Sequence, residues 1–181
     1  MTMRPDPRVT RIHSRVRTIA DFPKPGVQFR DITPLLADPE GLADTMAVLV
    51  DMAPDEVDVV AGIDSRGFLF GAPVAVAMGT GFVPVRKPGK LPGPVFEEAF
   101  DLEYGSSTLA IHQDALRPGQ RVLLVDDLLA TGGTLGAAVK LILREKAVLT
   151  HVETVIELPD LGGRAKLESL GVTSFSSILQ F

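Results

Sequence analysis

Residues 122–134 read Val-Leu-Leu-Val-Asp-Asp-Leu-Leu-Ala-Thr-Gly-Gly-Thr, and this stretch decides the fold class. Its four leading apolar residues predict a fully buried strand, and the glycines that follow the acidic pair open a helix. In open α/β sheets, ligands bind beyond the carboxyl ends of the strands. The stretch therefore predicts a strand of a parallel sheet and a ligand site at the edge of that sheet.

The rest of the chain repeats this alternation of strand and helix. The expected helices cover about residues 8–19, 39–52, 67–78, 131–146 and 162–170. The expected strands cover about residues 57–63, 81–86, 107–112, 121–125, 148–156 and 173–179. This order is typical of a doubly wound, mainly parallel α/β sheet flanked by helices, and we expect one domain over residues 1–181. Within the first helix, we expect the core contacts Val9, Ile12, Val16 and Ile19.

Residues 87–107 interrupt the alternation. They begin with Lys-Pro-Gly-Lys-Leu-Pro-Gly-Pro, in which proline and glycine break any regular element, and an acidic segment follows. Irregular excursions of this length in a compact domain are usually functional or disordered. We therefore expect a mobile excursion from the sheet here.

Composition excludes several classes of function. The 181 residues contain no cysteine, which excludes disulfides, thiolate metal sites and a cysteine nucleophile. The formal net charge of −5 argues against a general nucleic-acid binder. No targeting segment and no run of 18 apolar residues is visible. We expect a cytoplasmic protein without nucleic-acid or membrane partners.

The chemistry of residues 126–134 indicates a phosphorylated sugar ligand. Small residues, hydroxyls and backbone N–H groups at a helix N-terminus suit a phosphate dianion. The carboxylates of Asp126 and Asp127 suit hydroxyl groups, a magnesium-bearing ligand or a developing cation. An acidic pair or a Thr-Gly-Gly-Thr turn alone is commonly only a solvated turn, but their order here favours a site. A ribose 5-phosphate fits this combination.

Residues 122–134 resemble the phosphoribosyl diphosphate (PRPP) signature of type I phosphoribosyltransferases, and residues 128–134 are most similar to the adenine phosphoribosyltransferase family. Residues 22–36 resemble that family's base-binding entry, 64–68 its pyrophosphate loop, and 86–92 and 102–105 its hood. These motifs occur in the family's order, and the resemblance covers about residues 10–181. Two positions depart from it, because Lys146 stands where glycine often closes the helix and Phe100 where tyrosine is frequent.

The resemblance implies the type I phosphoribosyltransferase fold, with a base-binding segment at about residues 8–36 and a hood at about 87–107. It implies transfer of the 5-phosphoribosyl group from PRPP to adenine, giving AMP and pyrophosphate in purine salvage. Magnesium is expected to arrive with PRPP, with no ligand taken directly from the protein. A homodimer is also implied, in which Arg86 approaches the neighbouring subunit's site.

The same resemblance assigns roles to individual residues. The expected catalytic residues are Glu103 as proton donor to the purine, with Asp126, Asp127 and Arg66. The expected adenine-binding residues are Val27, Phe29, Arg30 and Leu158. The expected PRPP-binding residues are Asp126, Asp127, Ala130, Thr131, Gly132, Gly133 and Thr134. The expected pyrophosphate-binding residues are Ser65, Arg66, Arg86, Lys87 and Lys90, and Tyr104 is expected to close over the site. We also expect a cis peptide bond between Asp64 and Ser65, as is frequent in the family's pyrophosphate loop.

Two alternatives stay open at this point. The PRPP half of the site is compatible with a xanthine or hypoxanthine–guanine phosphoribosyltransferase, and only residues 27–31 and the Leu158 region favour adenine. If backbone groups at Val27 and Arg30 read the adenine edge, 6-oxopurines should be poor substrates. The other alternative is a PRPP-sensing regulator that has kept the fold but not the catalysis.

Overall fold

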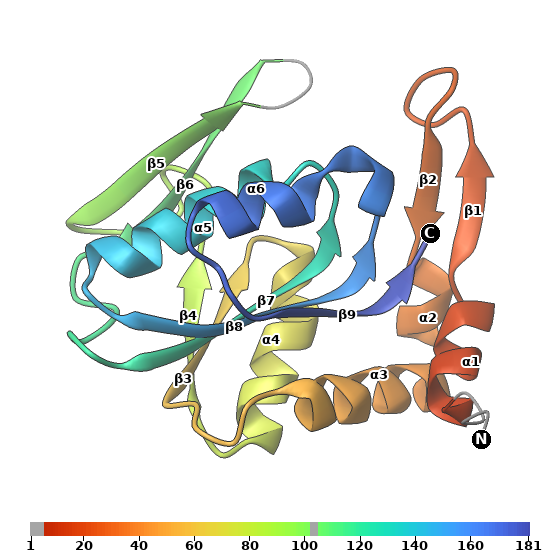
Figure 1. Ribbon diagram of the computed structural model, residues 1–181, viewed down its shortest axis with the longest axis horizontal. Helices are drawn as coiled ribbons and strands as arrows, with labels where there is room; N and C mark the ends of the chain where they lie inside the picture. Colours follow the sequence, from red (N-terminus) through yellow and green to blue (C-terminus); the bar gives the residue numbers. More distant parts are fainter. Residues whose placement is uncertain (1–5, 102–104) are drawn as a thin grey trace. The chain divides into compact units, whose positions relative to one another are not determined.

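The computed structural model describes residues 6–101 and 105–181, and the chain divides into two compact units, Met1–Asp51 and Met52–Phe181 (Figure 1). We call them the N-terminal and the C-terminal unit. Among the described residues, no helix is long and apolar enough to cross a bilayer.

The N-terminal unit combines a two-stranded hairpin with helices. Its elements are α1 (Pro7–Ser14), β1 (Arg17–Ala20), β2 (Gln28–Asp31), α2 (Thr33–Ala37) and α3 (Pro39–Met52). Strands β1 and β2 are antiparallel, and Arg17 pairs with Asp31 at one end of the ladder. Helix α1 is tied to α3 by an ion pair of 2.5 Å between Arg11 Nε and Asp44 Oδ2, and Ile12 is fully buried.

The first helix is shorter than the sequence predicts. It ends at Ser14, and the residues predicted as its last turn form β1 instead. Val16, Thr18 and Ile19 are β-branched, which lowers their helix propensity and favours a strand. Pairing with β2 therefore prevails over the helical spacing of Val16 and Ile19.

The C-terminal unit contains a parallel sheet, as predicted, but of five strands, because the strand predicted at about residues 107–112 pairs antiparallel in a separate sheet. The strands of the parallel sheet lie in the order β4-β3-β7-β8-β9, and all four pairings are parallel. They are β3 (Val59–Ile63), β4 (Gly81–Val85), β7 (Arg121–Leu129), β8 (Val148–Glu157) and β9 (Phe175–Gln180). Between them lie α4 (Arg66–Ala77), α5 (Gly133–Arg144), the 3-10 turn η1 (Pro159–Leu161) and α6 (Gly163–Ser169).

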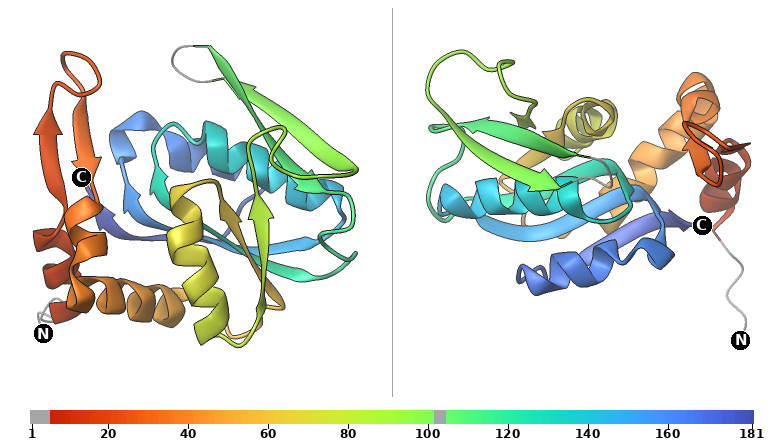
Figure 2. Two further views of the ribbon diagram at one scale, coloured as in Figure 1. Left: turned by 180° about the vertical axis from the view of Figure 1, so that it is seen from behind. Right: turned by 90° about the horizontal axis from the view of Figure 1, so that it is seen from above.

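Helices cover both faces of this sheet (Figure 2). The apolar cluster on one face joins strand residues such as Ala61 and Leu124 to α5, and Leu167 of α6 belongs to the same cluster. On the other face α4 lies so close that a Cβ at Gly71 would lie 3.5 Å from the Cα of Gly62. The doubly wound architecture is confirmed, and it directs the carboxyl ends of β3 and β7 to one edge.

The segment 87–107 is more regular than predicted. It contains β5 (Val95–Asp101), which pairs antiparallel with β6 (Ser106–His112). Every second residue of β5 meets α5: Arg144 lies 4.3 Å from the Phe96 ring centre, and Lys140 Nζ lies 2.7 Å from Glu98 Oε1. This period of two was the strand signal that the neighbouring prolines and glycines obscured.

Candidate active site

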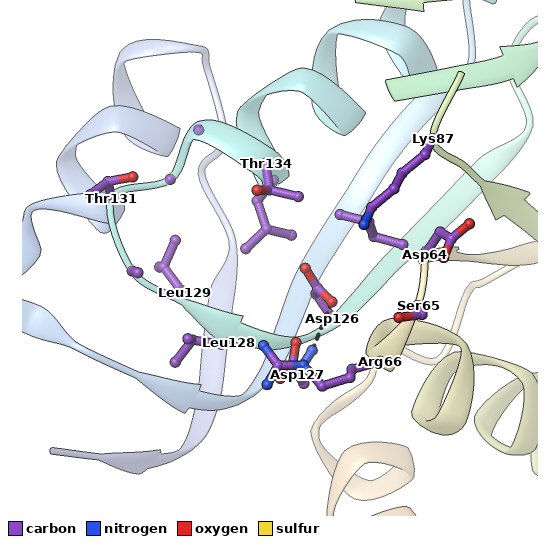
Figure 3. Close-up of a pocket in the computed structure, with 15 residues that line it drawn as sticks. Asp64, Ser65, Arg66, Lys87, Asp126, Asp127, Leu128, Leu129, Thr131 and Thr134 are labelled. Atoms are coloured by element: carbon purple, nitrogen blue, oxygen red, sulfur yellow. Dashed lines mark hydrogen bonds and ion pairs between the residues drawn. The ribbon is translucent and has the colours of Figure 1, made fainter. Parts of the chain in front are cut away.

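A cavity of about 350 Å³ lies at the carboxyl ends of β3 and β7 (Figure 3). All of its lining residues belong to the C-terminal unit. They are Ile63, Asp64, Ser65, Arg66, Lys87 and residues 126–135. Strand β7 continues past the predicted end at residue 125 to Leu129, so Asp126 and Asp127 are strand residues that border the cavity.

One wall of the cavity is the segment Ala130–Thr134, which we call the phosphate loop. It leads directly into α5, whose N-cap Gly132 has φ +78° in the left-handed region that favours glycine. The N–H groups of the first helical turn have no acceptor within the helix, and the helix dipole adds positive potential there. Figure 3 shows the hydroxyl-bearing side chains of Thr131 and Thr134 on this wall. The loop therefore has the donors that a phosphate group requires.

The opposite wall is formed by Asp126 and Asp127 together with Arg66, and we call it the acidic floor. The Asp127 N–H donates to Asp126 Oδ1 at 2.9 Å, and Arg66 Nε lies 2.9 Å from Asp127 Oδ2. Burial raises the pKa of Asp126 well above the usual aspartate value, and the charge of Asp127 adds to this effect. Burial also raises the pKa of Asp127, although Arg66 opposes the rise. These carboxylates therefore favour a ligand that brings hydrogen-bond donors or positive charge.

The turn that follows β3 completes the cavity. The peptide between Asp64 and Ser65 is cis, as predicted. Gly67, the second residue of α4, has no room for a side chain because a Cβ there would lie 2.8 Å from Asp126 Oδ1. Lys87 projects into the same cavity from the segment after β4 (Figure 3). Arg66 and Lys87 thus supply positive charge facing the phosphate loop.

Three predicted residues of this unit lie outside the cavity lining. Arg86 Nε donates to Asp64 Oδ2 at 3.1 Å, and its Nη1 donates to the carbonyl of Lys90 at 3.3 Å. Leu158 is half-buried on the turn after β8, where its N–H donates to the Leu129 carbonyl at 2.9 Å. Arg86 is thus one contact away from the cavity, and Leu158 is attached to the strand that carries the acidic floor.

The remaining predicted residues lie in the N-terminal unit or outside the described residues. Phe29 is half-buried in β2 and packs edge-on against Phe22, with ring centres 5.2 Å apart. Arg30 donates to the Thr18 hydroxyl across the hairpin, and Val27 precedes β2. Glu103 and Tyr104 lie outside the described residues.

The sequence placed residues 64–68 in the expected pyrophosphate loop but assigned no role to the Asp64 side chain. Asp64 lines the cavity and accepts a hydrogen bond from Arg86. Its signal was available, because Asp64 directly follows a buried strand in the same way as Asp126 follows residues 122–125. Gly163 was missed as well: a Cβ there would lie 2.2 Å from the Ala130 carbonyl, so α6 packs against the back of the phosphate loop. No local pattern in the sequence indicates that contact.

Comparisons with known proteins agree with this geometry. Residues 34–169 match the family model described as phosphoribosyl transferase domain. Adenine phosphoribosyltransferase of Cutibacterium acnes is 54% identical over 168 residues, which cover 93% of this chain and 95% of that protein. The crystal structure of the adenine phosphoribosyltransferase of Thermoanaerobacter pseudethanolicus is 44% identical, with a TM-score of 0.91 over 96% of this chain and 99% of that one.

A further crystal structure, the Saccharomyces cerevisiae adenine phosphoribosyltransferase complexed with adenine and D-2,5-dideoxy-2,5-imino-altritol 1,6-bisphosphate, is 35% identical. Its TM-score is 0.88, and the match covers 96% of this chain and 99% of that one. The family model covers most of the chain, and the relatives match along nearly their whole length. The chain therefore belongs to the adenine phosphoribosyltransferase family.

Proposed function

We propose that the protein transfers the 5-phosphoribosyl group from PRPP to adenine, giving AMP and pyrophosphate in purine salvage. One observation carries the proposal: the phosphate loop, the acidic floor and the cations Arg66 and Lys87 line a single cavity. The site thus offers hydrogen-bond donors or positive charge for an anion at two places, with the carboxylates of Asp126 and Asp127 between them. This distribution matches PRPP, which carries phosphate groups at both ends of a polyhydroxylated ring.

The acidic floor acts on the ribose. In the reaction the bond between the anomeric carbon and pyrophosphate breaks, the electron pair leaves with pyrophosphate, and a bond to N9 of adenine forms. The anomeric carbon passes through an oxocarbenium-like state, which negative charge nearby stabilises. Asp126 and Asp127 accept hydrogen bonds from the ribose hydroxyls and provide that charge. Burial raises the pKa of both residues, and the hydroxyl donors of the ribose and the developing cation act in the opposite direction, so the bound substrate favours the charged carboxylates.

The cationic side of the site acts on the leaving group. Arg66, Lys87 and the N–H groups after β3 neutralise the pyrophosphate as it departs. Arg86 and Lys90 lie in the adjoining segment, and Arg86 is already oriented by Asp64. Arg66 also pairs with Asp127, so the same guanidinium links the leaving group to the acidic floor.

Magnesium fits the donor chemistry of the site. Mg²⁺ prefers phosphate and carboxylate oxygens and keeps several waters, so it would be held by PRPP and approached by the oxygens of Asp126 and Asp127. When bound, it supplies neutralisation of the pyrophosphate charge. The residues of the chain hold the phosphates, orient the ribose and exclude water.

The base half of the site rests on the family resemblance. The resemblance gives Phe29 the role of stacking on the purine and the backbone groups at Val27 and Arg30 that of reading its edge. It assigns Leu158 separately as a purine contact. Glu103 donates a proton to another nitrogen of the purine ring while the N9 proton leaves to water, so that N9 becomes the nucleophile. Once the N9–ribose bond has formed, the donated proton returns to the Glu103 carboxylate. Tyr104 closes over the site. The yeast relative was crystallised with adenine, which supports a purine as the acceptor.

A direct assay tests the proposal. Purified protein is incubated with PRPP, Mg²⁺ and radiolabelled adenine, guanine, hypoxanthine or xanthine, and labelled nucleotide is separated. We expect AMP from adenine and at most trace product from the 6-oxopurines. Product from guanine or xanthine at a similar rate would assign the chain to the alternative enzymes, and binding of PRPP without any product would identify a regulator.

We also propose a homodimer in which Arg86 approaches the neighbouring subunit's site, and a cytoplasmic location. Both follow from the sequence argument. Light scattering on the purified protein measures the first, and fractionation of the native cells measures the second. A monomer at assay concentration that remains active would contradict the dimer.

A further inference from the structure

Outside the cavity, the most heavily hydrogen-bonded buried charge of the C-terminal unit is Glu157. This carboxylate ends β8 and is 2% exposed. It accepts from Arg164 Nε at 2.9 Å and Nη2 at 2.7 Å, a two-point contact, and from Ser177 and Gln180 of β9. The proposed reaction uses none of these groups.

Arg164 has an aromatic contact in addition to its two hydrogen bonds to Glu157. It is the second residue of α6, and its Cζ lies 4.5 Å from the ring centre of Phe175. Burial works to raise the pKa of Glu157, but the hydrogen bonds from Arg164 and Gln180 hold it below its ordinary value. The carboxylate is therefore charged at neutral pH, and the pair fixes the start of α6 to the ends of β8 and β9.

The start of α6 is also the back wall of the phosphate loop. A Cβ at Gly163 would lie 2.2 Å from the Ala130 carbonyl, and a Cβ at Gly132 would lie 2.9 Å from the Gly163 carbonyl. The backbone of Gly163 therefore lies against the backbone of Ala130 and Gly132, and neither glycine has room for a side chain. Lys166, one turn into α6, comes within 3.3 Å of the same Gly132 position.

We propose that the Glu157–Arg164 ion pair is a positioning device for the phosphate loop, and that Arg164 thereby sets the affinity for the 5-phosphate of the ribose. The inference rests on the proposed function of the cavity. The pair holds Gly163 against Ala130 and Gly132, and this contact keeps the N–H groups at the start of α5 directed at one anion. Arg164 binds Glu157 and lies over the Phe175 ring, and neither of these residues nor Arg164 lines the cavity among the described residues, so Arg164 is a positioning residue and not a catalytic one.

Calorimetric titration with two separate ligands tests the inference. Ribose 5-phosphate probes the phosphate loop, and pyrophosphate probes the turn after β3. In Arg164→Gln we expect the Kd for ribose 5-phosphate to rise at least about tenfold while that for pyrophosphate stays within about twofold. The KM for PRPP should rise with kcat at saturation nearly unchanged. Arg164→Lys keeps the charge without the two-point contact and should recover part of the affinity.

A matched control is Arg144→Gln. Arg144 also lies over an aromatic ring, that of Phe96, but at the far end of α5, about 16 Å from Gly133 by helix length. It should bind both ligands like the wild type. One reason for Arg164→Gln to fold poorly would be the buried Glu157 charge that is left without a partner. The double variant Glu157→Gln/Arg164→Gln removes that charge and should show the same loss of affinity for ribose 5-phosphate.

The outcomes are distinct. Wild-type affinity for ribose 5-phosphate in Arg164→Gln and in the double variant would overturn the inference. An equal loss of affinity for ribose 5-phosphate and for pyrophosphate would also overturn it. A wild type that binds neither ribose 5-phosphate nor PRPP would overturn the proposed function, and the inference with it.

Discussion

The two walls of the cavity obtain their chemistry in different ways. The acidic floor depends on side-chain charge: Asp126 and Asp127 are buried and adjacent, and Arg66 forms an ion pair with Asp127. The phosphate loop contains no charged residue between Ala130 and Thr134, and its donors are backbone groups whose direction depends on Gly132 and Gly163. Substitutions in the floor should therefore change the reaction rate, whereas substitutions in the loop should change ligand affinity through packing.

The difference also explains where each wall tolerates change. A buried carboxyl with a raised pKa gains little folding stability from its charge, so its amide analogue can fold equally well. A glycine that contacts neighbouring backbone has no such substitute, because any Cβ must displace the chain. The floor should thus separate activity from stability, and the loop should not.

The largest effect is expected from Asp127→Asn, and Asp126→Asn is its companion variant. We expect kcat to fall by about 100-fold or more, since the charge facing the oxocarbenium-like state is lost. The melting temperature should change little, because burial disfavours the charged form of both residues. Steady-state kinetics and calorimetry on the same preparations measure the two effects.

The control for that prediction is Asp58→Asn. Asp58 precedes β3, and its Oδ1 lies 2.7 Å from Arg121 Nη2. The hydrogen bonds from Arg121 lower the pKa of Asp58 to about 2. This variant should keep full turnover. Equal losses of activity and stability in both floor variants would contradict the distinction between the walls.

The next largest effect is expected from Gly132→Ala in the phosphate loop. The new Cβ meets the Gly163 carbonyl at 2.9 Å, and φ is +78°. We expect the Kd for ribose 5-phosphate to rise about 30-fold and the free energy of unfolding to fall by about 1–3 kcal/mol. Gly119→Ala has φ +77° with no atom within 4 Å, so it isolates the backbone strain, which should cost about 1 kcal/mol without loss of affinity. Identical binding by Gly132→Ala and wild type would show that the packing is dispensable.

Glu153 shows what burial does to an acid whose basic neighbour is a histidine and not an arginine: His151 Nε2 lies 3.8 Å from Glu153 Oε1, and burial lowers the pKa of His151. Glu153 pairs in register with Val125, its carboxyl oxygens accept no hydrogen bond, and burial raises its pKa to about 8. The unfolded chain therefore loses this proton first, and the free energy of unfolding should fall as the pH rises from about 4.5 to about 8.

Glu153→Gln should remove this fall. We expect the difference in unfolding free energy between pH 5 and pH 8 to shrink by at least about 1.4 kcal/mol, the value of one pKa unit. Urea unfolding at the two pH values measures it. Parallel pH profiles for Glu153→Gln and wild type would contradict the assignment.

The smallest effect is expected at Lys146. This residue has φ +59° after α5, the left-handed position in which the family often has glycine. Lys146→Gly should raise the free energy of unfolding by about 0.5–1 kcal/mol, because the strain of a side chain in this region is relieved. Activity should be unchanged. A loss of stability on thermal scanning would contradict this interpretation.

Much of the fold could be predicted because local patterns and the tertiary structure agree. Residues 122–134 combine a buried strand, an acidic pair and a glycine turn, and the part from Asp126 to Thr134 lines one cavity. The prediction failed where tertiary pairing prevailed over local signals: Val16 and Ile19 keep helical spacing but precede or join β1, and the breakers at 88–94 hid the strand that starts at Val95.

The candidate site was predictable only on the side that faces the ligand. Thr131 and Asp126 carry chemistry that can be recognised from the residue types. Gly163 and Arg164 act from behind the loop, and their contact with Ala130 depends on how α6 returns across the sheet. A sequence lists such residues, but only the tertiary arrangement shows what they touch.

The last strand has a practical consequence for handling the protein. Gln180 donates to Glu157 Oε2 at 3.0 Å, and the Phe181 N–H donates to the Glu157 carbonyl at 3.1 Å. Proteolytic trimming back to Leu179 would thus remove two donors from the residue that fixes α6 behind the phosphate loop. A sample trimmed in this way would keep its entire cavity lining and would be only two residues lighter. It should nevertheless bind ribose phosphates more weakly than the intact chain.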